Sequence, residues 1–378
     1  MHFYHNIKYL MLHDTLSKFY VMFSLRSFGL AMINLFLPIF IFTIRSSLFD
    51  LVNFFFFEFL AILLFFPIAG KLSARIGTAH TMLFSSPFII SFFALLYFFN
   101  PVLIGLSAIG FLLGFGEAFF WMPFHEEFSF ISKTKRVGRE VGKYRVINIV
   151  AALLGPFIGG AIIALFGFHW VFLLTIILIL IGQIPLLLSK DIKPKQKFHF
   201  RHIFKKRHFP YFFPFVGHGA IGIATSCLWP IFIFILFPDF VLIGAIAMVV
   251  NFISIFSTLY ISKKCDSFGK EQLVKTGSVL FSLTVMLRAF TTTIIHAVTM
   301  WFFGGLTWAL LDVPFESLVY QKSKHQNKPE FFVAREMSLD VGRFIVLAVV
   351  FLLATNISLA LSTAILVGGI LGLWYWLT

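Results

Sequence analysis

The stretch VFLLTIILILIG, residues 171 to 182, carries no charged side chain over its whole length. Strands of a membrane β-barrel alternate apolar and polar residues, whereas a helix surrounded by lipid and other helices is apolar throughout. Inside lipid the backbone must also satisfy its own hydrogen bonds. The stretch therefore predicts a membrane-spanning helix.

The composition of the whole chain indicates many such helices. Of the 378 residues, 59% are hydrophobic and only 12% are charged, and the mean hydropathy is +0.94. A water-soluble protein would carry about 25% charged residues. The composition excludes an ordinary soluble protein and predicts an all-α integral membrane protein.

Twelve apolar segments match the thickness of a bilayer, which a helix of about 20 residues crosses. They lie near residues 19–43, 48–69, 80–99, 101–124, 146–166, 169–188, 211–237, 240–261, 273–295, 296–320, 337–355 and 358–377. Turn residues keep several connections short, namely Asn100-Pro101, Gly167-Phe168, Pro238-Asp239 and Asn356.

Basic residues gather on one side of the predicted membrane. Of the 30 lysines and arginines, 26 lie in alternate connections and at the N-terminus, and the opposite connections hold only Arg45. Positively charged loops stay in the cytoplasm. We therefore expect a multi-pass protein of the cell membrane with both termini cytoplasmic. Residues 1–18, with three histidines, an acid and no cleavage site, do not resemble a secretory signal.

The basic stretch at 189–210 is interpreted as a cytoplasmic linker that rests on anionic lipid, and no nucleic-acid partner is predicted. Cys227 and Cys265 lie within the membrane and at its cytoplasmic face, so no disulfide is expected.

The two halves of the chain resemble each other. Pro-Phe at 123–124 recurs at 314–315, and each pair is followed by a basic loop and an Arg-Glu pair. Parallel repeats of this kind occur in transporters. The sequence predicts two six-helix bundles, 19–188 and 211–378, which are joined by the linker and preceded by the segment 1–18.

The connection after the second predicted span reads GKLSARIG, residues 70 to 77, and resembles the loop signature of the major facilitator superfamily. SKKCDSFGK, residues 262 to 270, is similar to a second copy. Ala74 replaces the acid in the first copy, and Ser267 replaces the cation in the second. The resemblance assigns gating to the residues that match: Gly70, Arg75, Gly77, Asp266, Gly269 and Lys270.

The fifth predicted span contains ALLGPFIGG, residues 152 to 160, which with Ala151 is similar to the antiporter signature of the same family. The matching residues are Gly155, Pro156, Gly159 and Gly160. The resemblance implies export, whereas small residues in a span also permit ordinary close packing of helices. Both interpretations stay open at this point.

Ionisable side chains inside spans are costly and often mark a transport pathway. Arg26 and Glu117 each lie about seven residues from the predicted cytoplasmic end of their spans. The family resemblance implies that spans one, four, seven and ten line the central path, so we expect this pair to face across it. Glu58, an acid near the middle of span two, is a candidate proton carrier. Asp340 and Arg343, three residues apart, are expected to form a local pair.

The second half offers an equivalent set of polar and aromatic residues. At 100° per residue, His218, Thr225 and Trp229 share one helix face, as do Trp308, Asp312 and Glu316, while Trp121 shares a face with Glu117. Such stripes are predicted to line the substrate and proton pathway, although aromatic stripes also serve packing.

GFGEAFFWMPFHEEF, residues 114 to 128, places His125, Glu126 and Glu127 beyond Pro123, at the predicted cytoplasmic mouth. No HExxH pattern is present, so an interfacial hydrogen-bond cluster is expected there in preference to a metal site. No cofactor is predicted, and no nucleotide-binding loop is evident.

The sequence therefore predicts a secondary transporter that moves a small organic solute by alternating access, exchanges it for protons, acts in export and functions as a monomer. Two alternatives remain: an integral-membrane enzyme acting on lipid-linked substrates, and a receptor or scaffold of the same fold that transports nothing.

Overall fold

The computed structural model describes residues 15–99, 105–131, 137–189, 193, 199–200, 203, 210–265, 269–324 and 326–378. The regular elements in these ranges are helices: α2 (Thr15–Ile33), α3 (Leu37–Arg45), α4 (Leu48–Ile76), α5 (Thr78–Tyr97), α6 (Leu106–Ile131), α7 (Val137–Phe166), α8 (Phe168–Leu187), α9 (Phe212–Ile223), the π-helical turn η4 (Ala224–Leu228), α10 (Trp229–Leu236), α11 (Phe240–Lys264), α12 (Lys270–Arg288), α13 (Ile294–Ser323), α14 (Lys328–Leu352), α15 (Ile357–Gly372) and the 3₁₀ turn η5 (Leu373–Leu377).

These helices account for all twelve predicted spans. In the described ranges, ten helical segments are long and apolar enough to cross a membrane. The other two predicted spans correspond to α12 and α14, which carry more charged side chains. Asp239, Thr293 and Asn356 each begin a helix by accepting a backbone N–H in its first turn. These caps explain why the connections there are so short.

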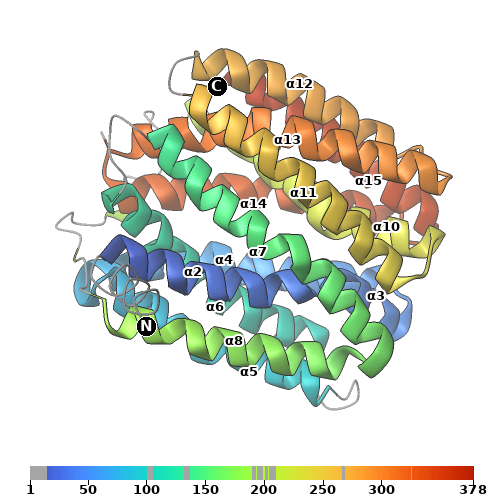
Figure 1. The fold of residues 1–378 in the computed structure, drawn as a ribbon, viewed down its shortest axis with the longest axis horizontal. Helices are drawn as coiled ribbons and strands as arrows, with labels where there is room; N and C mark the ends of the chain where they lie inside the picture. The colour runs from blue at the N-terminus through green and yellow to red at the C-terminus, as the bar shows by residue number, and fades with distance from the viewer. Residues whose placement is uncertain are drawn as a thin grey trace, which may run out of the picture.

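Most helices of the first half of the chain lie in the lower part of Figure 1, and most of those of the second half lie above them, while α7 (green) crosses diagonally from the upper left to the lower right. In the first half α4 packs on α6 and α2 on α7 and α8, and in the second half α12 packs on α13 and α9 on α14. The halves meet mainly where α7 packs on α11 and where α4 packs on α14. The division of the chain at 189–210 stays a prediction, since most of that linker lies outside the described residues.

Two spans that the sequence predicted as continuous helices are interrupted. The first ends at Ile33 and resumes at Leu37, because Pro38 lacks the N–H that would bond to the Asn34 carbonyl. The seventh has the π-turn η4 before Pro230, which likewise lacks the donor for the Ser226 carbonyl.

The interpretation of residues 70–77 as a loop is wrong in its extent. Residues 70–76 form the last turns of α4, which ends at Gly77. Gly77 has a φ of 102°, and its N–H donates to the Ser73 carbonyl. Only this glycine makes the expected turn; Gly70 lies within the helix against Met122. Arg75 is exposed near the helix end. The helix continues because no proline or glycine interrupts residues 71–76.

In the second copy of this signature, Gly269 precedes α12 and the Lys270 ammonium donates to the Gln321 side chain over 3.3 Å. Asp266 lies outside the described residues.

The glycines of ALLGPFIGG lie where three helices cross. A Cβ on Gly155 would lie 2.6 Å from the Ala31 Cβ, one on Gly159 would lie 1.9 Å from the Met32 carbonyl oxygen, and one on Gly160 would lie 2.4 Å from the Phe240 carbonyl oxygen. Pro156 presents its own carbonyl to Gly244 of α11. The motif therefore packs α7 closely against α2 and α11, as small residues do in membranes.

Gly159→Ala should lower the stability of the purified protein by about 1 to 3 kcal/mol, because the added methyl cannot fit without a shift of the backbone. Gly222→Ala is the matched control, since no heavy atom lies within 4 Å of its Cβ position and alanine favours a helix. Thermal unfolding in detergent measures both. Equal unfolding temperatures for the two variants would contradict the close crossing.

Candidate functional site

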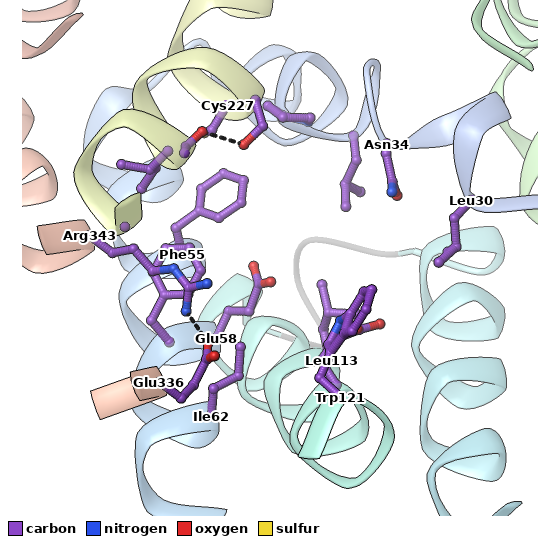
Figure 2. A pocket seen from close by; sticks show the side chains of 18 of the residues that line it. Leu30, Asn34, Phe55, Glu58, Ile62, Leu113, Trp121, Cys227, Glu336 and Arg343 are labelled. Atoms are coloured by element: carbon purple, nitrogen blue, oxygen red, sulfur yellow. Dashed lines mark hydrogen bonds and ion pairs between the residues drawn. The ribbon is translucent and has the colours of Figure 1, made fainter. Parts of the chain in front are cut away.

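A cavity of about 350 Å³, here called the central cavity, lies between helices of the two halves. Its walls come from α2, α3, α4, α5 and α6 on one side and from α9, η4 and α14 on the other. Polar side chains from both halves face it, namely Asn34, Glu58, Glu117, Trp121, His218, Ser226, Glu336 and Arg343. Figure 2 shows several of these side chains around the open space.

Arg26 and Glu117 form an ion pair, as their positions in the spans predicted. An Arg26 nitrogen donates to a Glu117 oxygen over 2.6 Å, and the Arg26 side chain is 2% exposed. The guanidinium also lies 3.7 Å from the centroid of the Phe120 ring. Glu117 faces the central cavity, while Arg26 lines a second cavity. The charge of Arg26 is thus balanced at the boundary between the two cavities.

The second cavity, of about 340 Å³, shares Leu30, Asn34, Trp121 and Ser226 with the central cavity. Asn148 and Asn251 add amide groups from α7 and α11, and Trp301 adds an indole from α13. Sequence reasoning missed both asparagines, although an amide side chain in an apolar span is itself a signal of polar surroundings.

Arg343 makes a second buried charge cluster. Its guanidinium donates to Asp340 over 2.6 Å and to Glu336 over 2.7 Å, and it lies 4.7 Å from the centroid of the Phe59 ring. The pair of Asp340 and Arg343 was predicted. Sequence reasoning missed that Glu336 joins it and that Glu336 and Arg343 face the cavity. Residues at i, i+4 and i+7 share a helix face, and that spacing of Glu336, Asp340 and Arg343 was the available signal.

Glu58 extends from α4 into the open space of the central cavity (Figure 2). Among the described residues, no cation forms an ion pair with it, and its buried Oε2 atom has no hydrogen-bond partner. Its position is fixed by a close crossing, since a Cβ on Gly114 of α6 would lie 1.9 Å from the Glu58 carbonyl oxygen. The close crossing therefore fixes the backbone position of Glu58, and its carboxyl group is available to bind a ligand in the cavity.

The predicted residues of the second half divide into two groups. His218 lines the central cavity, and its Nδ1 lies 2.5 Å from the Tyr375 hydroxyl. The other predicted residues lie outside the walls of both cavities. The Thr225 hydroxyl donates to backbone carbonyls of its own helix, and Trp308 packs on His218 and Phe281. Trp229, Asp312 and Glu316 are buried.

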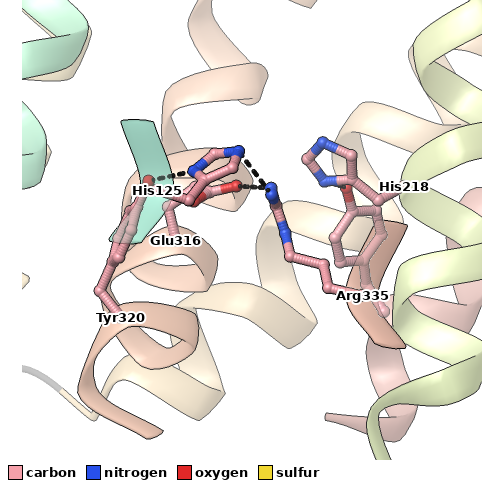
Figure 3. Close-up of polar contacts among 6 residues, drawn as sticks. His125, His218, Glu316, Tyr320 and Arg335 are labelled. Atoms are coloured by element: carbon pink, nitrogen blue, oxygen red, sulfur yellow. Dashed lines mark hydrogen bonds and ion pairs between the residues drawn. The ribbon is translucent and has the colours of Figure 1, made fainter. Parts of the chain in front are cut away.

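A buried ionic and hydrogen-bonded network joins α6 to α13 and α14, and it includes His125 and Glu316 (Figure 3). His125 Nδ1 lies 2.7 Å from the Tyr320 hydroxyl, and its Nε2 lies 2.9 Å from an Arg335 nitrogen. Arg335 also donates to Glu316 over 2.6 Å. We call these four residues the inter-helix network.

The network confirms that a hydrogen-bond cluster forms here, but it corrects the prediction that His125, Glu126 and Glu127 lie at the membrane interface. All three are at most 7% exposed. Glu126 accepts from the Ser73 hydroxyl of α4 over 2.7 Å, and the hydroxyls of Ser129 and Ser323 lie 2.8 Å apart one turn farther along α6 and α13. The cluster is buried because α6 continues to Ile131, so these side chains meet neighbouring helices and not water.

Arg26→Ala and Glu117→Ala should each lower the free energy of unfolding by about 3 to 5 kcal/mol, because each leaves a buried charge without its partner. The double replacement should lower it by less than the sum of the two single effects. The ion pair of Arg45 and Asp50, whose side chains are 54% and 24% exposed and lie 3.8 Å apart, is the control and should give a coupling free energy of at most about 1 kcal/mol. Unfolding of the purified variants measures both cycles. Additive losses at Arg26 and Glu117 would mean that the two charges are not coupled.

The arrangement of helices is shared with solved transporters. The human organic anion transporter MFSD10 (TETRAN) superposes with a TM-score of 0.66 at 12% identity, over 95% of this chain and all of that one. A bacterial homologue of the iron transporter ferroportin, in an outward-facing state with soaked iron, superposes with a TM-score of 0.67 at 11% identity, over 95% of this chain and 98% of that one. At such identities the likeness shows the fold alone.

A similarity in sequence to another protein also covers most of the chain. YqgE of Bacillus subtilis (strain 168) is 24% identical over 371 residues, which cover 91% of this chain and 84% of that protein. The model of the Major Facilitator Superfamily matches residues 19–347. With described helices that account for the twelve predicted spans, a cavity between the halves and a family match over most of its length, this chain belongs to the major facilitator superfamily of membrane transporters.

Proposed function

We propose that the protein is a secondary transporter that moves a small organic solute by alternating access, exchanges it for protons and acts in export. The central cavity carries the proposal, because it lies between the two halves and collects ionisable side chains from both. Such groups in the interior of a membrane protein mark a pathway by default. The monomeric state, the cell membrane and the cytoplasmic termini belong to the same proposal.

Alternating access requires contacts that close one side of the cavity and then break. The inter-helix network and the pair of Ser129 and Ser323 suit this role, since they join α6 of one half to α13 and α14 of the other. They lie near the helix ends that are predicted to face the cytoplasm. We therefore assign these contacts to a cytoplasmic gate, and their presence here corresponds to its closed state in this proposal.

Proton exchange is supported by Glu58 and Glu117, two carboxyl groups that face one cavity from neighbouring helices. Export is supported by the likeness of ALLGPFIGG to the antiporter signature. The alternatives find less support: an enzyme acting on lipid-linked substrates needs reactive groups at a membrane interface, whereas these groups lie between the helices. A receptor without transport has no evident use for charged groups in a cavity.

The gate is tested with a disulfide between Ser129→Cys and Ser323→Cys in a background with Cys227→Ala and Cys265→Ala. The two hydroxyls lie 2.8 Å apart, so the introduced sulfurs are close enough to form a bond. Oxidation should stop transport of a solute found by a thermal-shift binding screen, and reduction should restore it. The single-cysteine variants should be unaffected by oxidation. Full transport by the oxidised double variant would show that α6 and α13 do not separate.

Proton coupling is tested with Glu58→Gln and Glu117→Gln in everted vesicles. If one of these residues carries the proton, its replacement should abolish uphill uptake driven by a pH gradient and leave exchange of solute at equal, saturating concentrations on the two sides, because exchange needs no net proton movement. Uphill transport at the wild-type rate by both variants would remove these carboxyl groups from the coupling mechanism.

A further inference from the structure

The acids and cations around the central cavity do not balance. Arg343 is the only arginine or lysine among the described residues in its wall, and it is already bonded to Glu336 and Asp340. Arg26, behind the wall, is bonded to Glu117. Two cations thus face three paired acids, and Glu58 adds a fourth acid without an ion pair among the described residues.

Such an excess of carboxyl groups favours a positive occupant. Charges interact more strongly between packed helices than in water, because the effective dielectric constant there is lower. A cation that enters the cavity would be attracted to Glu58, whereas an anion would meet three acids facing it, Glu58, Glu117 and Glu336. The charge distribution of the wall therefore selects the sign of the ligand.

The aromatic part of the wall indicates what kind of cation fits. Both buried arginines beside the cavity are held by an acid and a ring together, Arg26 by Glu117 and Phe120 and Arg343 by its acids and Phe59. The same two components recur around Glu58, where Phe55 lies on the same helix and Trp121 faces the same cavity. Aromatic faces bind organic ammonium groups in this way.

We infer that the central cavity binds a monovalent organic cation, with an ammonium or similar group against Glu58 and an apolar or aromatic body against Phe55 and Trp121. This inference rests on the proposed transport function and names the substrate class for it. The cavity volume of about 350 Å³ suits a ligand of one or two rings.

Two probes of similar shape and opposite charge test the inference: phenyltrimethylammonium and benzenesulfonate. Titration calorimetry on the purified full-length protein should show the cation binding with a Kd of about 1 mM or better and the anion at least about tenfold more weakly. Glu58→Gln should weaken binding of the cation at least about tenfold, because it removes the charge and keeps the shape. Glu58→Asp should retain most of the binding.

Glu271→Gln, the same chemical change at an exposed position in the first turn of α12, is the matched control and should bind the cation as the wild type does. Equal binding of the two probes, unchanged binding of the cation by Glu58→Gln, or no binding of the cation in the millimolar range would overturn the inference.

Vesicles separate this outcome from a failure of the proposed function. If the purified protein binds the cation through Glu58 but vesicles containing it do not exchange the cation across the membrane, the substrate class holds and transport is contradicted. If the vesicles transport a solute that is neutral or anionic and the cation does not compete with it, transport holds and the substrate class is contradicted.

Discussion

The structure depends on one constraint: a charge placed among apolar helices needs a partner, because lipid supplies none. Arg26 meets this constraint with Glu117 and Phe120, and Arg343 meets it with Glu336, Asp340 and Phe59. These partners fix which faces of α2, α4, α6 and α14 turn inward. The central cavity lies beside these charge pairs, because the paired charges would be costly at positions that face lipid.

The same constraint explains what the sequence could predict. Twelve apolar segments are visible directly, because each must be long enough for the bilayer and the backbone must be helical. The contact between Arg26 and Glu117 was predictable because both residues lie at equal distances from helix ends on the same side, and because the family resemblance implies that their two spans line the central path. Asp340 and Arg343 were predictable from spacing along one helix.

Other features depend on how far helices extend and which faces meet, and these were missed. The predicted spans placed residues 321–335 in a connection between helices, but α14 begins at Lys328. Arg335 and Glu336 therefore lie inside a helix and join buried networks. His125 and Glu126 were placed at an interface because the charged residues around them resembled a membrane boundary. Thr225, Trp229 and Trp308 were predicted to line the pathway, yet none of them lines either cavity. Hydropathy does not reveal which helix packs on which.

The interruptions in the first and seventh spans have a further consequence. They occur at corresponding places in the repeat, with Pro38 in one half and Pro230 in the other, 192 positions apart. Each leaves a short outer rod, α3 or α10, beyond a longer inner rod, and these two short rods touch each other across the halves. A proline removes a hydrogen bond from a helix and permits a bend at that point. The places at which these two spans can bend therefore lie between the short outer rods and the inner rods that carry Arg26 and His218.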